Sequence, residues 1–196
     1  MYKIACHAPN FIPWLPYFYK MAMADKFIIL KYVQFRKGGF ENRYTLSNGN
    51  IVTKPIKHGL ENIKDKKYAD GTDLFDINMN WIDAIRKTLN IDTRIVFEHN
   101  TGLLGTQRLI DLIKAHNGSV YVTNPSAKDK YLDEDLMRSQ GIEIEYCKIP
   151  RHLQIHTFEA FEKWGIEGTK KQFPSKFKTT FHDDTHKYFG EKVCKA

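Results

Sequence analysis

The sequence has few cysteines and no long hydrophobic run. Its three cysteines, Cys6, Cys147 and Cys194, lie far apart without Cys-x-x-Cys spacing, so neither a disulfide framework nor a zinc site is indicated. The N-terminus has no signal-peptide pattern, and no later segment reaches the ~18 consecutive apolar residues of a membrane span. These absences predict a soluble, cytoplasmic protein.

Familiar catalytic and nucleotide-binding motifs are also missing. The chain contains no GxxxxGK[ST], GxGxxG or GxSxG pattern, and no signature of a nucleic-acid-binding module. Two histidine pairs have the i, i+4 spacing of metal ligands on a helix, His182 with His186 and His152 with His156. Neither pair has a third ligand at a recognisable spacing, so no metal site and no nucleic-acid partner are predicted.

The composition is that of one globular, basic domain. The 196 residues are 42% hydrophobic, which is enough for one sizeable core, and we expect a single domain over residues 1–196. Thirty Lys and Arg residues against 23 Asp and Glu residues give a formal net charge of +7. This charge favours an anionic partner such as a phosphate, a nucleotide, a nucleic acid or an anionic lipid, and its sign alone does not choose among them.

Strand and helix patterns alternate along the chain. A buried strand is expected at 2–6, a helix beginning near Pro16, and a second strand at 27–35. A hairpin is expected around an Asn-Gly turn at 47–56, and the lysine-rich stretch 57–76 reads as an irregular excursion. Further helices are predicted at 78–89, 106–116 with Thr106 as N-cap, 126–140 and 157–164, further strands at 93–98, 119–123 and 142–146, and a less regular segment after 165. This order predicts an α/β fold with a mostly parallel sheet flanked by helices.

Polar side chains follow the ends of three predicted strands. His7 follows the first strand. Gln34, Arg36, Lys37, Asn42 and Arg43 follow the second, and Asn124, Ser126 and Lys128 follow the strand at 119–123. Ligands of open parallel sheets bind beyond the carboxyl ends of the strands, and free N–H groups of a helix beginning near Ser126 would favour phosphate. The three loops together predict a site for an anionic substrate.

Structural explanations exist for the same residues. A histidine near a strand end is often a hydrogen-bonded structural residue, and a basic loop such as that of Arg36 and Lys37 is often merely solvated. Cys6 and His7 point to opposite faces if the strand continues through them, so Cys6 is assigned to the core. Trp14 and its aromatic neighbours fit the core or a pocket wall better than base stacking.

Two blocks of the sequence resemble the WbqC-like family. The first is HAPNFIPWLPYFYKMAMADKFIIL followed by VQFRKGGFENR, and the second is TQRLIDLIKAHNGSVYVTNPSAKDKYLDEDLMRSQGIEIEY. The matching residues are His7, Pro9, Asn10, Pro13, Trp14, Asp25, Gln34, Asn42, Arg43, Pro125, Ser126, Tyr131 and Leu132. Ala8 stands where the family usually has Gln, Asn124 where it often has Gly, and the segment IHTFEAFEKWG follows the family's C-terminal helix only loosely.

The resemblance implies a role in bacterial surface polysaccharide biosynthesis, that is, the O-antigen of lipopolysaccharide. Family members are associated with the transfer of glycine or another acyl group to an amino sugar, so a nucleotide-linked amino sugar is the implied substrate. In this interpretation His7 is the general base, Asn10, Gln34 or Asn42 donates to the oxyanion, and Arg43 and Lys37 hold phosphate. The remaining predicted substrate contacts are Trp14, Asn124, Ser126, Lys128 and Tyr131.

The sequence does not identify the acyl donor. A carrier-protein thioester, a coenzyme A thioester and an adenylate made from ATP all remain candidates, and no cofactor is assigned. Two other functions remain open. One is a nucleotidyltransferase or ATP-dependent ligase, which a histidine after the first strand favours. The other is a non-catalytic module that binds a sugar nucleotide or a carrier.

Overall fold

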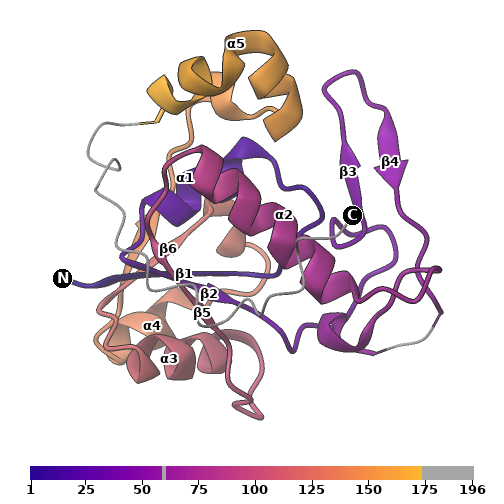
Figure 1. Ribbon diagram of the computed structural model, residues 1–196. Helices are drawn as coiled ribbons and strands as arrows, with labels where there is room; N and C mark the ends of the chain where they lie inside the picture. The colour runs from indigo at the N-terminus through magenta and orange to yellow at the C-terminus, as the bar shows by residue number, and fades with distance from the viewer. Residues whose placement is uncertain (59–60, 174–196) are drawn as a thin grey trace.

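A five-stranded parallel sheet forms the centre of the protein (Figure 1). The computed structural model describes residues 1–58 and 61–173. The strands are β1 (Lys3–His7), β2 (Lys26–Ile29), β5 (Arg94–Phe97), β6 (Val120–Thr123) and β7 (Glu143–Tyr146), and their order across the sheet is β5-β2-β1-β6-β7. Every neighbouring pair in this sheet is parallel. The predicted α/β fold class is confirmed.

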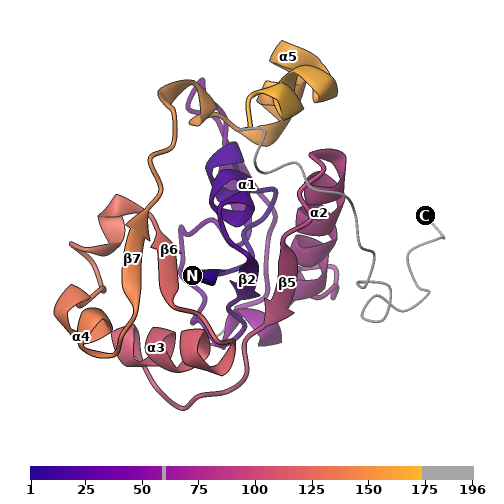
Figure 2. The same cartoon turned by 90° about the vertical axis from the view of Figure 1, so that its left-hand side faces the viewer.

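Helices cover both faces of the sheet (Figures 1 and 2). One face carries α1 (Leu15–Ala22), α2 (Leu74–Thr88) and α5 (Thr157–Lys171), which is kinked at Gly165; the other carries α3 (Gly105–Ala115) and α4 (Glu134–Ser139). Side chains of β1 alternate between the two layers, with Ala5 in the core on the α1 face and Ile4 and Cys6 in the core on the α3 face. The prediction that Cys6 belongs to the core is therefore confirmed. None of the helices within residues 1–58 and 61–173 is long and apolar enough to cross a lipid bilayer.

The chain adds strands first on one side of β1 and then on the other, so the strand order has a switch point at the centre of the sheet. From β1 the chain moves outward to β2 and β5, and it then returns to the other side of β1 to form β6 and β7. The two halves therefore diverge between β1 and β6. Such a switch point leaves a crevice at the carboxyl ends of the two strands, which is the usual ligand site of open α/β sheets.

The hairpin and the excursion lie between β2 and α2. Strands β3 (Arg43–Thr45) and β4 (Ile51–Thr53) pair antiparallel around the Asn-Gly turn, as predicted. Within its described residues, 57–58 and 61–73, the excursion contains one 3-10 turn, Ile63–Asp65. Helix α2 begins at Leu74, earlier than predicted, because Leu74 is buried against the core and extends the apolar face of the helix toward its N-terminus. The stretch 57–76 is thus irregular only as far as Asp73.

Three other element predictions were wrong in detail. The second strand does not continue to residue 35. It ends at Ile29, where its partners His7 and Phe97 also end. The segment 126–140 is not one helix, because a 3-10 turn at Pro125–Ala127 is separated from α4, which Asp133 caps by accepting the Leu136 N–H.

The assignment of Thr106 as a helix cap was also wrong. The N-cap of α3 is Leu104, and the Thr106 hydroxyl instead donates to the Tyr131 carbonyl and accepts the Asp133 N–H. Thr106 therefore ties α3 to the segment that leads into α4. The C-terminal helix, predicted to end at 164, is interrupted there by the non-helical backbone of Gly165 (φ 67°), and a second helical stretch follows as far as Lys171. The histidine pair at residues 182 and 186 and Cys194 lie outside the described residues.

Candidate functional site

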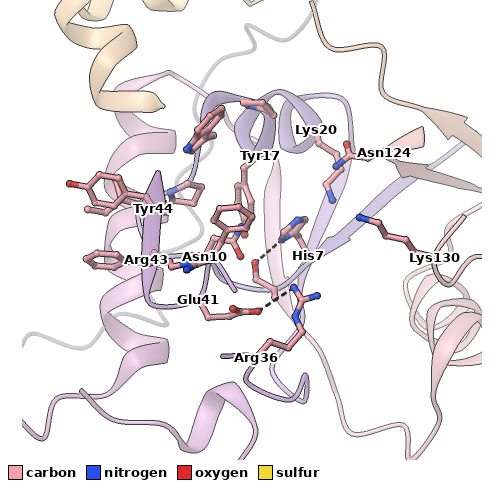
Figure 3. Close-up of a pocket in the computed structure, with 17 residues that line it drawn as sticks. His7, Asn10, Tyr17, Lys20, Arg36, Glu41, Arg43, Tyr44, Asn124 and Lys130 are labelled. Carbon is pink, nitrogen blue, oxygen red and sulfur yellow. Dashed lines mark hydrogen bonds and ion pairs between the residues drawn. The ribbon is translucent and has the colours of Figure 1, made fainter. Parts of the chain in front are cut away.

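A cavity of about 420 Å³ opens at the switch point, on the face of the sheet that α1 covers (Figure 3). His7, the last residue of β1, and Asn124, the first residue after β6, both line it. The rest of the wall comes from the turn between β1 and α1, from α1 itself, and from the chain between β2 and β3. The cavity thus occupies the position that the strand order predicts for a ligand.

The imidazole of His7 is held in one orientation. Its Nδ1 lies 2.9 Å from the Ala8 carbonyl oxygen, which can only accept, so Nδ1 carries the proton and Nε2 is the free acceptor. The ring also packs edge-on against Tyr17, with 4.9 Å between ring centroids. Burial, followed by the positive charge of Lys20, lowers the His7 pKa from its ordinary 6.5 to about 3. His7 is therefore a neutral base at physiological pH.

Lys20 brings a buried ammonium group to the same cavity. It lies on α1 and is only 3% exposed, and its Nζ donates to the Cys6 carbonyl at 3.0 Å. Burial lowers the pKa of this amine to about 8. The side chain is nonetheless mostly protonated at pH 7, so it places a positive charge beside His7.

The chain between β2 and β3 contributes a buried carboxylate and two arginines. Glu41 is 3% exposed, and its Oε1 lies 3.6 Å from Nη2 of the exposed Arg36. The guanidinium group of Arg43 donates a hydrogen bond from Nη2 to the Gly38 carbonyl oxygen. Groups of both charge signs therefore face the cavity, with cations in excess.

Unpaired polar atoms concentrate around this cavity. Seven buried side-chain nitrogen or oxygen atoms within the described residues have no hydrogen-bond partner, and five of them belong to residues that line it. The five atoms are Trp14 Nε1, Tyr17 Oη, Glu41 Oε2, Arg43 Nε and Asn124 Oδ1. Buried polar groups are normally paired, so a cluster that contains both donors and acceptors points to a polar ligand.

Two helices hold the turn that follows His7. The buried Asn78 of α2 donates its Nδ2 hydrogens to the Pro9 carbonyl at 2.8 Å and the Glu41 carbonyl at 2.7 Å. At the start of α5, Thr157 donates to the Pro13 carbonyl at 2.6 Å, and His156 Nε2 lies 3.2 Å from the Ile12 carbonyl oxygen. The cavity wall is therefore supported by buried polar contacts from outside the sheet.

A second cavity, of about 290 Å³, lies beside the first and extends over the α3 face. It shares His7, Ala8 and Arg36 with the first cavity, and most of its remaining wall is apolar or aromatic. Arg108 of α3 also lines it and is held by the buried carboxylate of Glu98, while its Nη2 has no partner. His7 thus lines both cavities, and each cavity could bind a different molecule.

The structure brings about half of the predicted site residues together. His7, Asn10, Trp14, Arg43 and Asn124 line the first cavity, and Tyr131 lines the second.

The other predicted site residues, Gln34, Lys37, Asn42, Ser126 and Lys128, line neither of the two cavities. Gln34 is exposed beside Asn62, and the Asn42 amide donates to the Lys54 carbonyl. Lys37 and Ser126 are exposed, and Lys128 lies 3.4 Å from Glu134. The predicted helix N-terminus near Ser126 is a single 3-10 turn, in which the Ala127 and Lys128 N–H groups are bonded to Asn124 and Pro125.

Sequence reasoning missed several residues of the wall. They are Lys20, Glu41, Tyr44 and Lys130. A signal existed for Lys20, because it follows Pro16 by four residues and Tyr17 by three, which places a charged residue on the inward face of an apolar helix. Glu41 had no such signal, since it lies in a polar loop.

The comparison with protein families agrees with the resemblance in the sequence. The model of the WbqC-like protein family matches residues 8–73 and 53–164, which is most of the chain. The chain belongs to the WbqC-like protein family. A relative in Mycobacterium tuberculosis, the uncharacterized protein Rv1507c, is 25% identical to this WbqC-like chain over 190 residues, covering 74% of this chain and 82% of that protein. No solved structure matches this WbqC-like protein.

Proposed function

We propose that this protein transfers glycine or another acyl or aminoacyl group to the amine of a nucleotide-linked amino sugar, in bacterial surface polysaccharide biosynthesis. The cluster of unpaired donors and acceptors around the first cavity is the observation that supports this best. Sugar hydroxyls both donate and accept hydrogen bonds, so one sugar ring can satisfy both kinds of group. Aromatic side chains, including those of Trp14 and Tyr44, supply apolar wall beside them, as is usual in small-molecule sites.

His7 is the general base in this proposal. Its Nε2 accepts a proton from the sugar amine while the amine nitrogen forms a bond to the carbonyl carbon of the donor. The Asn10 amide, which also lines the cavity, donates to the oxyanion that forms. When the carbon–donor bond breaks, the histidine returns the proton to the leaving group. Gln34 is not assigned this role, because it lies away from the cavity.

The low pKa of His7 makes its basicity depend on the substrate. Burial, and then the charges of Lys20 and Arg36, oppose a positive charge on the imidazole. An anionic substrate offsets these charges and raises the His7 pKa toward the range that favours proton transfer. The second cavity, which also reaches His7, is the place we propose for the acyl donor.

A ligand screen followed by a transfer assay tests this function. Thermal-shift measurements with nucleotide amino sugars, coenzyme A and ATP identify what binds, and mass spectrometry then detects the acylated sugar. We expect His7→Ala to bind the sugar nucleotide but to lower turnover by about 10²-fold or more. The matched control is His152→Ala, which removes an exposed histidine outside both cavities. Full turnover by a folded His7→Ala variant would contradict the role of His7.

The strand order favours one alternative function. A switch point with cations on its wall is also the arrangement of nucleotide-binding α/β enzymes, so nucleotidyl transfer or ATP-dependent ligation is the second candidate. Stabilisation by ATP alone, with release of pyrophosphate during turnover, would favour this candidate over acyl transfer.

A further inference from the structure

Lys20 carries a buried charge that the protein itself does not neutralise. Its side chain is 3% exposed, and no carboxylate of the described residues lies within 4 Å of its ammonium nitrogen. The Cys6 carbonyl accepts one of its three N–H groups. The Phe27 ring lies 5.8 Å from the ammonium nitrogen, and the nearby thiols of Cys6 and Cys147 have raised pKa values and are uncharged at neutral pH, so neither is a counter-ion.

Another lysine of the same chain shows the usual arrangement. Lys66 is 2% exposed, but its ammonium nitrogen lies 2.5 Å from a Glu61 carboxylate oxygen and 3.4 Å from the Lys57 carbonyl. A buried charge without a counter-ion is unfavourable, so it requires a reason to be retained. Lys20 differs from Lys66 in facing a cavity, where a ligand can supply the missing negative charge.

We propose that Lys20 and Lys130 form a subsite for the diphosphate of the ligand, at the crevice between the carboxyl ends of β1 and β6. Lys130 lines the cavity from the segment after β6, and it too has no carboxylate within 4 Å among the described residues. In Figure 3 its ammonium group extends toward His7 and Asn124, and Lys20 lines the same cavity. The proposal rests on the proposed use of a nucleotide-linked sugar, whose diphosphate it places.

The chemistry of the two side chains suits a phosphate. A lysine ammonium acts as a compact point charge with several donors, and two of them from different segments of the wall, α1 and the chain after β6, can contact different oxygens of one diphosphate. The diphosphate then lies at the inner end of the cavity, on the Lys20 side of His7. The sugar remains free to meet the unpaired atoms of Glu41 and Arg43 at the other end.

Binding of inorganic pyrophosphate tests the subsite without the sugar or the acyl donor. Its dissociation constant is measured by isothermal titration calorimetry for the full chain and for Lys20→Met and Lys130→Glu. We expect both variants to bind pyrophosphate at least about tenfold more weakly, because each loses a charge-assisted contact. Two matched controls are expected to stay within about twofold of the parent protein. They are Lys66→Met, another buried lysine, and Lys128→Glu, a neighbouring lysine outside the cavity.

Several results would overturn the subsite. They are an absence of pyrophosphate binding by the parent protein, unchanged binding by Lys20→Met, and an equal loss in the controls. If Lys20→Met does not fold, the comparison of Lys130→Glu with Lys128→Glu decides in the same way, because both residues are exposed. The test is separate from the transfer reaction. Lysine-dependent pyrophosphate binding without acyl transfer contradicts only the proposed reaction, and acyl transfer unaffected by Lys20→Met contradicts only the subsite.

Discussion

His7 owes its charge state to the side chains around it. The Ala8 carbonyl determines which nitrogen carries the proton, and burial together with Lys20 and Arg36 prevents the ring from gaining a second one. The same surroundings explain why a histidine occupies this position. His7 alternates with Cys6 along β1, so its imidazole faces the cavity while Cys6 lies in the core on the opposite face.

Acid should destabilise the protein partly through His7. Its pKa is about 3 in the folded chain and near 6.5 when unfolded, so between these values only the unfolded chain binds the proton. Stability from the neutral ring is therefore complete above pH 6.5 and is lost as the pH falls toward 3. The parent protein loses free energy of unfolding when the pH falls from 7 to 4.5. We expect this loss to be smaller in His7→Gln by on the order of 1–2 kcal/mol.

Urea unfolding at the two pH values measures this difference. His152→Gln is the control, because it removes an exposed histidine, and it should leave the pH dependence as it is in the parent protein. An identical acid loss in His7→Gln and the parent would show that His7 is protonated as easily in the folded chain as in the unfolded one.

At the scale of elements, α2 positions both the turn after β1 and the loop that carries Glu41. Asn78 performs this task with one amide, which donates to Pro9 and Glu41 and accepts from the Tyr68 hydroxyl at 3.2 Å. All three contacts are buried, so their loss leaves backbone carbonyls without partners. The turn and the loop lie far apart in sequence, and this amide joins them at the cavity.

Replacing Asn78 with Ala should destabilise the protein and loosen the cavity. We expect a loss of about 2–4 kcal/mol in the free energy of unfolding, because two buried carbonyls and one hydroxyl lose their partner. Equilibrium denaturation measures the loss. The control is Asn80→Ala on the exposed side of the same helix, which should change stability by less than about 0.5 kcal/mol. Equal effects of the two substitutions would mean that the Asn78 contacts contribute nothing beyond helix propensity.

At the scale of the whole molecule, the strand order and the charge act together. The order places the crevice between β1 and β6, and the cations Lys20, Arg36, Arg43 and Lys130 all line the cavity there. The formal net charge of +7 adds a favourable long-range field for an anionic ligand. Glu41, the one carboxylate among the lining residues, is paired with Arg36.

Ligand binding should therefore weaken with salt. Raising sodium chloride from about 50 to about 300 mM shortens the screening length, and we expect the affinity for a nucleotide-linked sugar to fall by about 3–10-fold. The same sugar without its nucleotide should show no such dependence, because it carries no phosphate. Calorimetric titrations at the two salt concentrations measure both. Equal salt sensitivity of the two ligands would show that the cations do not recognise the phosphates.

The features that could be predicted from the sequence are mostly local. The alternation of strands and helices, the hairpin at the Asn-Gly turn and the position of His7 at a strand end follow from residue periodicity and turn residues, which act over a few neighbours. The same local signals misjudged the segment 126–140 and Thr106. There, contacts between α3 and residues 131–133 replace the helix that the pattern favours.

The set of residues that share the site depends on contacts between distant segments. The strand order joins His7 to Asn124 across more than half of the chain, and the loop after β2 brings Glu41 and Arg43 to the cavity while Gln34 and Lys37 stay outside. The hydrogen-bond partners of Lys20 and Asn78 could not be predicted from the sequence either. The physical reason is that burial and pairing are properties of contacts between distant segments, whereas the pattern of neighbouring residues reports only the conformation of each segment.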